Sequence, residues 1–193
     1  MEKSEYQTPD WALDVISKVN KNRSTELNLS GSAVYRLSKI PPEIFDLTWL
    51  ESLSLANNDL TDMPVSIGRL KNLRSLNLRD NRLTYIHSTL ILFENLYSLD
   101  LSSNQVAKIP DTLSQLKNLK YLSLGSNKIA KIPDTLGQLE RLDSLDLSSN
   151  QIAKIPSTLS QLKNLKYLRL GSNKIAKIPD TLGQLERLDS LVL

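Results

Sequence analysis

Two consecutive segments of the chain, residues 99–144 and 145–190, are each 46 residues long and nearly identical. They differ at three positions, where Val106 becomes Ile152, Asp111 becomes Ser157 and Ser123 becomes Arg169. Each segment is itself two copies of a 23-residue unit. A period of this length indicates a solenoid, in which every unit buries its apolar side against the next unit. The repetition therefore limits the fold more strongly than any local propensity does.

The 23-residue period extends upstream to residue 50. Seven leucines open successive units: Leu50, Leu73, Leu96, Leu119, Leu142, Leu165 and Leu188. Each full unit follows LxxLxLxxNxLxxIPxxLxxLxx, in which the alternating leucines of LxxLxL point to one side of a short strand. The proline discourages further strand, and the apolar spacing of three after it fits 3-10 or short helical turns. Stacked copies therefore predict a parallel sheet whose leucine side is covered by helical turns.

These in-phase copies strongly resemble the leucine-rich repeat family over residues 24–193. The resemblance implies an α/β repeat fold: a curved solenoid with a parallel concave sheet and a convex side of 3-10 or short helical turns. About seven full units plus a truncated last strand are expected. The opening STELNLSG (24–31) is similar to bacterial intracellular repeats, such as those that precede Roco GTPase domains. Because no GTPase motif lies in this chain, the resemblance implies only a recognition or regulatory module.

Residues 8–22 (TPDWALDVISKVNKN) predict a helix. Thr8 suits the N-cap, Pro9 the first helical position, and Asp10 complements the positive end of the helix dipole. One apolar stripe is formed by Trp11, Val15, Ile16 and Val19. Because a solenoid exposes apolar core at its ends, we expect residues 1–23 to be an N-terminal segment whose helix caps the repeat array of residues 24–193. A partner-binding helix is the alternative.

A second periodic feature is an asparagine at the ninth position of six units: Asn58, Asn81, Asn104, Asn127, Asn150 and Asn173. A side-chain amide both donates and accepts hydrogen bonds, so it can satisfy backbone groups where the chain leaves the strand. An unpaired buried amide would be costly. We therefore interpret this asparagine ladder as structural, and not as a catalytic or glycosylation feature.

The outward positions of the strands are expected to form the concave face. Tyr121 and Tyr167 occupy the third position of two units, and a strand spacing of about 4.8 Å would place them roughly 10 Å apart. Tyrosine and arginine are enriched among the residues that dominate binding at interfaces. The candidate partner-binding residues are Arg79, Asp100, Tyr121, Asp146, Tyr167 and Arg169. The alternative is a solvated face in which Tyr167 is simply the copy of Tyr121.

Charged residues form rows across the stack. Two rows alternate in sign, which supports the register by about 0–1 kcal/mol per exposed pair. They are Lys117, Glu140, Lys163 and Glu186, and Lys120, Asp143, Lys166 and Asp189. A third row keeps one sign, with acidic residues three positions later: Lys108, Lys131, Lys154 and Lys177, followed by Asp111, Asp134 and Asp180. The aspartates would neutralise most of this row, and a basic strip for phosphate or an anionic membrane is the alternative.

The third unit departs from the pattern, because His87 replaces the proline and Phe93 replaces a leucine. His87 is the only histidine, and no acid or nucleophile accompanies it in a motif. We therefore expect a loop residue with no special role rather than a catalyst. Ile91 and Leu92 either form an exposed apolar patch with Phe45 or pack locally against a neighbouring turn.

Composition limits the chemistry of the chain. With no cysteine and one histidine, it offers neither a disulfide framework nor a thiolate metal site. No GxxxxGKS/T loop and no supported Ser–His–Asp set is present. The net charge of +3 comes from interspersed signs, which argues against nucleic acid. We therefore expect no enzymatic activity, no cofactor, no metal site and no nucleic-acid partner.

Residues 1–11 lack the apolar run of a signal peptide, and no stretch approaches the ~18 apolar residues of a membrane span. A soluble cytoplasmic protein without a membrane partner is therefore expected. The favoured function is a protein–protein interaction scaffold that binds an unknown protein partner on the concave face, within a larger signalling protein. The alternatives are an engineered or recently duplicated structural array without an evolved ligand, and an effector-like protein that acts on a host pathway.

The sequence stops inside a predicted strand, where Val192 replaces the aspartate of earlier copies. An open strand edge invites pairing with another chain. We therefore expect either a piece of a longer protein or self-association through the C-terminal strand near Val192.

Overall fold

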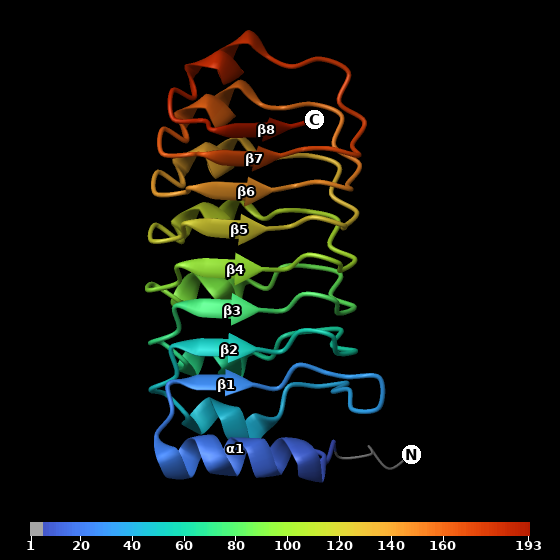
Figure 1. Ribbon diagram of the computed structural model, residues 1–193, viewed down its shortest axis with the longest axis vertical. Coiled ribbons are helices and arrows are strands. Elements are labelled where there is room, and N and C mark those ends of the chain that lie inside the picture. Colours follow the sequence, from blue (N-terminus) through green and yellow to red (C-terminus); the bar gives the residue numbers. More distant parts are fainter. Residues whose placement is uncertain (1–5) are drawn as a thin grey trace.

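Eight short strands form one parallel sheet, and their order across the sheet is their order along the chain (Figure 1). The computed structural model describes residues 6–193. The strands are β1 (Glu26–Asn28), β2 (Ser52–Ser54), β3 (Ser75–Asn77), β4 (Ser98–Asp100), β5 (Tyr121–Ser123), β6 (Ser144–Asp146), β7 (Tyr167–Arg169) and β8 (Ser190–Val192). Neighbouring strands pair without offset, so Leu122 of β5 lies between Leu99 of β4 and Leu145 of β6. The parallel sheet predicted from the repeat is confirmed.

A 3-10 helix lies between each strand and the next, and these helices form the layer behind the sheet (Figure 1). They are η1 (Pro42–Asp46), η2 (Val65–Arg69), η3 (Ser88–Leu92), η4 (Asp111–Gln115), η5 (Asp134–Gln138), η6 (Ser157–Gln161) and η7 (Asp180–Gln184). In five units the residue directly before the helix is a proline with φ between −70° and −72°: Pro64, Pro110, Pro133, Pro156 and Pro179. The pyrrolidine ring fixes φ near these values and ends the strand-like segment. The predicted helical layer of the solenoid is confirmed.

The core lies between the sheet and the 3-10 layer and runs through the whole stack. One unit shows the pattern, with seven residues that are each exposed by 2% or less: Leu119, Leu122, Leu124, Ile129, Ile132, Leu136 and Leu139. Full burial of such a side chain contributes roughly 1.5–3 kcal/mol. Because equivalent residues of successive units pack on one another, a single apolar core holds the stack together.

The ladder asparagines lie where the chain turns away from the strand. The Oδ1 atom of Asn127 accepts a hydrogen bond from the Val106 amide of the preceding unit at 2.9 Å. Its Nδ2 atom donates to the carbonyls of Leu101, Leu124 and Gly125 at 3.0, 3.0 and 3.2 Å. The other five asparagines of the ladder make the equivalent contacts. Each amide therefore joins two units through four backbone groups.

Helix α1 (Asp10–Asn22) lies at the end of the stack, next to β1 and η1 (Figure 1). Its buried residues are Ala12 and Ile16, which belong to the common core. Beyond the helix, the guanidinium of Arg23 lies 4.0 Å from the centroid of the Trp49 ring. The first five residues of the expected segment 1–23 lie outside the described residues.

The predicted start of this helix is wrong by one cap residue. Pro9 occupies the N-cap position and makes no side-chain capping bond. Thr8, the predicted N-cap, is buried, and its hydroxyl donates to Glu43 Oε2 of η1 at 2.8 Å. Because the helix begins at Asp10, Thr8 lies one residue before the N-cap, and its hydroxyl forms a strong bond to a charged acceptor instead. Thr8 therefore fastens the helix to the first unit instead of capping its own backbone.

A second set of asparagines lies just before the strands. The Asn118 amide donates to the Glu94 carbonyl of the preceding unit at 2.8 Å, and its Oδ1 accepts from Arg141 of the next unit at 2.6 Å. Arg187 donates to Asn164 in the same way at 2.7 Å. Within the two 46-residue blocks asparagine and arginine therefore alternate at this position, so a pair of units is the structural repeat there.

A serine and a glycine alternate in the 3-10 layer with the same two-unit period. The Ser114 hydroxyl donates to the Asp111 carbonyl within η4 at 2.8 Å. At the equivalent Gly137 of η5, an added Cβ would lie only 2.2 Å from the Thr158 carbonyl oxygen of the next unit. Because no side chain fits there, η5 and η6 approach each other closely. This contact gives the 46-residue period a physical basis.

The residues in the two rows of alternating charge do not form ion pairs with one another. Among residues 6–193, no nitrogen in either row lies within 4.0 Å of a carboxylate oxygen. Instead, Lys117 and Lys163 each donate to a backbone carbonyl of the following unit, Gln138 and Gln184, at 3.3 Å. The lysines thus bind the backbone of the next unit rather than its acidic side chains.

The irregular third unit has a structural explanation. His87 lies in the loop directly before η3, as expected, and its Nδ1 caps that helix by accepting a hydrogen bond from the Thr89 amide at 3.1 Å. Phe45 is buried, which rules out an exposed patch shared with Leu92. The Leu92 side chain packs over Gly68, where a Cβ would lie 2.5 Å from it. Leu92 therefore packs locally against the neighbouring turn, which is the second of the two expectations.

Candidate partner-binding face

Tyr121 and Tyr167 stand on the concave face, where the strands present their outward side chains. Tyr121 begins β5 and Tyr167 begins β7, and each pairs with Ser144 of the intervening strand β6. The two tyrosines are 41% and 47% exposed. Because Ser144 between them is small, both tyrosine rings project above the sheet and are open to solvent.

Arg169 and Asp146 extend this group. Arg169 ends β7 and pairs across the sheet with Asp146 at the end of β6. The Arg169 Nη1 atom lies 3.9 Å from Asp146 Oδ2, and its side chain is 65% exposed. An exposed pair at this distance is weak, so Arg169 remains available for another anionic group. The structure thus brings four predicted residues together on β5, β6 and β7.

Asp100 and Asp146 also have a local structural role that the sequence did not reveal. Asp100 Oδ1 accepts from both the amide and the hydroxyl of Ser102, at 2.8 and 2.6 Å. Asp146 makes the same two contacts with Ser148, at 2.9 and 2.6 Å. These hydrogen bonds stabilise the turn after each strand. One carboxylate oxygen of each aspartate is therefore committed to the fold.

Arg79 lies apart from the tyrosines, just after β3. Its Nε atom donates to Asp80 Oδ2 at 3.0 Å. This hydrogen bond, the charge of Asp80 and the charge of Asp100 together raise the pKa of the Arg79 side chain. Arg79 is thus paired within its own turn, two strands away from Tyr121.

Tyr97 is a site residue that sequence reasoning missed. It lies just before β4, and its ring meets that of Tyr121 edge to face with centroids 5.1 Å apart. Lys120 Nζ lies 5.4 Å from the centroid of the Tyr97 ring. Hydrogen bonding with the Tyr97 hydroxyl raises the pKa of Tyr121, and the Asp143 charge adds to the rise while Lys120 opposes it.

The repeat register did not reveal this contact. Tyr97 and Tyr121 are 24 residues apart, which is one unit plus one residue. Residues one step out of register would lie on opposite faces of a regular sheet, but Tyr97 precedes β4 and escapes this alternation. We name Tyr97, Tyr121 and Tyr167 the tyrosine patch.

The residue types on this face are those that are common in protein interfaces. Tyrosine supplies rigid contact area at low entropic cost, and serine supplies adaptable hydrogen bonds. Within the described part of the chain, no group of three or more His, Cys, Asp or Glu side chains is arranged to hold a metal ion. No helix in residues 6–193 has the length and apolar character needed to cross a membrane.

Two family models match the chain, a leucine-rich repeat region over residues 89–193 and a leucine rich repeat over residues 24–83. The chain belongs to the leucine-rich repeat family. The resemblance inferred from the repeated leucines is thereby confirmed. Leucine-rich repeats commonly serve as protein-binding scaffolds, and this coarse assignment agrees with the exposed aromatic face.

Several solved leucine-rich repeat structures are similar to this one. A leucine-rich repeat protein of Leptospira interrogans is 40% identical with a TM-score of 0.83, over 87% of this chain and 42% of that one. An internalin of Listeria monocytogenes is 29% identical with a TM-score of 0.78, over 92% of this chain and 50% of that one.

The third relative is the ectodomain of the Arabidopsis thaliana membrane receptor kinase GASSHO1/SCHENGEN3, in complex with CASPARIAN STRIP INTEGRITY FACTOR 2. It is 32% identical with a TM-score of 0.76, over 84% of this chain and 20% of that one. The present chain thus spans half or less of each of these three relatives. Among curated proteins, none matches the sequence.

Proposed function

We propose that this leucine-rich repeat chain is a recognition module that binds a protein partner on its concave face, at the tyrosine patch. The observation that carries the proposal is the edge-to-face contact of Tyr97 and Tyr121 on a sheet whose other outward residues are mostly polar, with serine the most frequent. Exposed aromatic side chains that are already held in place lose little entropy on binding and are typical anchors of interfaces. The complex formed by the related receptor ectodomain supports a binding role.

The proposal places this module in a larger signalling protein of the cytoplasm and gives it no catalytic step. Its support is the opening STELNLSG, which resembles bacterial intracellular repeats. Arg169 and Asp146 flank the tyrosines and would select a partner with charges of both signs. Arg79 and Asp100 would contact only a partner long enough to reach β3 and β4.

The test compares partner capture by the intact chain and by the double variant Tyr121→Ala, Tyr167→Ala. Loss of two anchors is expected to abolish capture, because each such truncation costs about 2 kcal/mol or more. Tyr85→Ala is the matched control, since Tyr85 is as exposed as Tyr167 but lies on the segment before η3. A capture profile that is the same for all three chains would refute the tyrosine patch and favour a duplicated structural array without a ligand.

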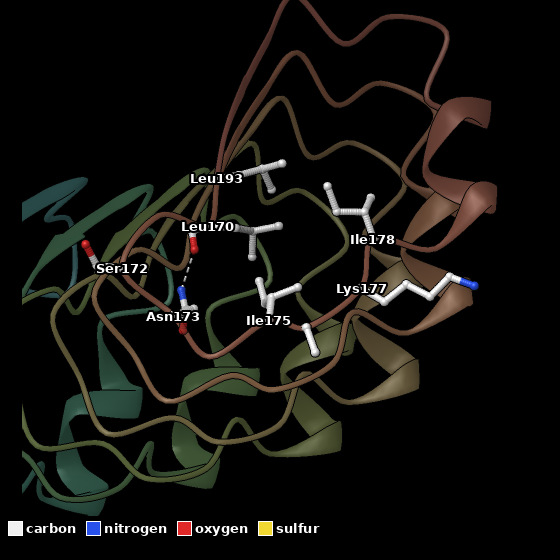
Figure 2. A pocket seen from close by; sticks show the side chains of 8 residues that line it. Leu170, Ser172, Asn173, Ile175, Lys177, Ile178 and Leu193 are labelled. Atoms are coloured by element: carbon white, nitrogen blue, oxygen red, sulfur yellow. Dashed lines mark hydrogen bonds between the residues drawn. The ribbon is translucent and has the colours of Figure 1, made fainter.

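Self-association through β8 is a second candidate. β8 is the last strand of the sheet and pairs only with β7. Beside it, Leu170, Ile175 and Leu193 line a cavity of about 490 Å³ (Figure 2). Val192 is 48% exposed. We propose that two copies pair their β8 strands, because an open edge with apolar surroundings favours strand addition.

Sedimentation over a wide concentration range tests this second candidate. A dimer is expected for the unaltered chain, and Val192→Lys should keep it monomeric, because an edge lysine opposes strand pairing. A monomer at every concentration of the unaltered chain would refute it without affecting the tyrosine patch.

A further inference from the structure

Four lysines occupy the same position in four consecutive units, two residues before the proline. They are Lys108, Lys131, Lys154 and Lys177, and we call them the lysine strip. All four are exposed. Figure 2 shows the side chain of Lys177 extending away from the cavity lined by Leu170 and Ile175. The strip therefore presents its charges to solvent on the flank between the concave sheet and the 3-10 layer.

The strip has no acidic partner at contact distance. Among residues 6–193, no carboxylate oxygen lies within 4.0 Å of any of the four ammonium groups. Two of the aspartates three positions later accept hydrogen bonds from threonines of the next unit: Asp111 from the Thr135 hydroxyl at 3.0 Å, and Asp134 from the Thr158 hydroxyl at 3.2 Å. At the third lysine the aspartate is missing altogether, because Ser157 replaces it. The aspartates therefore form no ion pair with the row, and its neutralisation by their charges at longer range stays a prediction.

Stability does not account for four like charges in register. At two other positions the same stack alternates lysine with an acidic residue, as in Lys117 and Glu140. The two-unit period would permit the same alternation of sign at the lysine strip. Both units of each pair carry lysine there instead. Stacked like charges repel each other. The row therefore calls for an explanation outside the fold.

The surface around the strip has a shape that suits an extended chain. A groove of about 530 Å³ has Lys108 and Lys131 among its lining residues, and a neighbouring groove of about 320 Å³ has Lys131 and Lys154. Both also contain isoleucine and proline, so the grooves are partly apolar between the charged groups. Asp134 lines both grooves and Asp111 also lines the first, so lysines outnumber carboxylates only in the groove of Lys131 and Lys154.

We propose that the lysine strip is a second interaction surface, which binds an extended acidic polypeptide segment rich in glutamate or aspartate. Charge complementarity supplies the attraction, and the partly apolar grooves accept the backbone and methylene groups of such a segment. A nucleic acid fits less well, because neither groove is lined by an aromatic residue for base stacking or an arginine for bidentate phosphate contact. This surface is independent of the tyrosine patch.

The experiment measures binding of a fluorescent peptide of about twelve consecutive glutamates, long enough when extended to pass several units. Binding at about 50 mM salt is expected to weaken at about 300 mM, because exposed charges are screened. The variant Lys131→Glu, Lys154→Glu should weaken binding by about tenfold or more, since attraction becomes repulsion at both grooves. The milder Lys131→Gln, Lys154→Gln should give a smaller loss, and circular dichroism checks that both variants stay folded.

Lys117→Glu, Lys163→Glu is the matched control. It makes the same change in net charge at a row on another part of each unit, and less than about twofold loss is expected there. Equal losses in the control and the strip variant would overturn the proposal, because only net charge would then matter. Absence of peptide binding at low salt would also overturn it. Tighter binding of oligothymidylate or of phosphatidylserine vesicles than of the peptide would show that the strip takes another kind of partner.

Discussion

At the scale of single residues, the stack depends on groups that reach from one unit into the next. Asn127 pairs with backbone groups of two units, and Thr8 ties the first helix to η1. Gly137 acts by lacking a side chain, since only hydrogen atoms fit beneath the Thr158 carbonyl. Contacts between individual residues of this kind therefore set the spacing between neighbouring units.

The two equivalent glycines of the blocks are expected to respond differently to alanine. At Gly137 an added Cβ would lie 2.2 Å from a backbone oxygen, so Gly137→Ala should lower the free energy of unfolding by about 1–3 kcal/mol. At Gly183 nothing lies within 4 Å of the added Cβ, and Gly183→Ala should be neutral or stabilising by up to about 1 kcal/mol. Urea denaturation measures both. The same effect at both positions would contradict the close approach of η5 and η6.

Periodicity made some residue roles predictable and hid others. The asparagine ladder could be placed from sequence because all six copies are the same residue. The Asn118–Arg141 contact could not, because the residue type changes from one unit to the next and the period does not show which side chains reach each other. The Thr8–Glu43 bond joins residues outside the regular register, and only the folded chain brings them together.

At the scale of elements, the solenoid is a set of short strands and 3-10 turns that have no stability of their own. Each strand contributes only three residues to the sheet, and the units gain their stability by stacking. Helix α1 differs from these short elements, because it is 13 residues long and has two buried positions. We propose that it serves as the cap expected for residues 1–23.

The cap proposal predicts that Ile16→Ala destabilises the isolated chain. Ile16 is 5% exposed and belongs to the common core, so its truncation should lower the free energy of unfolding by about 2–4 kcal/mol. Ser17→Ala, at an exposed position of the same helix, should change it by less than about 0.5 kcal/mol. Thermal unfolding of the chain without any partner checks both. A stable Ile16→Ala variant would favour the alternative of a partner-binding helix.

At the scale of the whole molecule, the two proposed recognition surfaces differ in origin. The tyrosine patch includes Tyr97, which lies outside the two 46-residue blocks, so it is not a simple product of the duplication. The lysine strip recurs in every unit of both blocks. Sequence predicted the row of lysines and two of the three tyrosines, whereas the ion pairing of the charged side chains required coordinates, because a salt bridge depends on side-chain reach and not on register alone.

The duplication also leaves β3 with two possible neighbours. β4 and β6 are both Ser-Leu-Asp, and the residues that follow them differ at few positions between the blocks. During refolding, β3 can therefore dock on β6 and leave the first block looped out of the stack. That arrangement satisfies the local pairing but forfeits the burial of two units, so the chain must undo it before reaching the native state.

Deletion of residues 145–190 removes the competing copy while keeping the strand register. Stopped-flow refolding of the full chain is therefore expected to show a slow phase that the shortened chain lacks. Prolyl isomerase separates this phase from proline isomerisation, because a misdocked block would be insensitive to the enzyme. A slow phase that persists after the deletion would contradict the misdocking. If the misdocking occurs, near-perfect repetition slows the folding of this chain. Substitutions at the few positions where the blocks differ would then reduce the competition between the two copies.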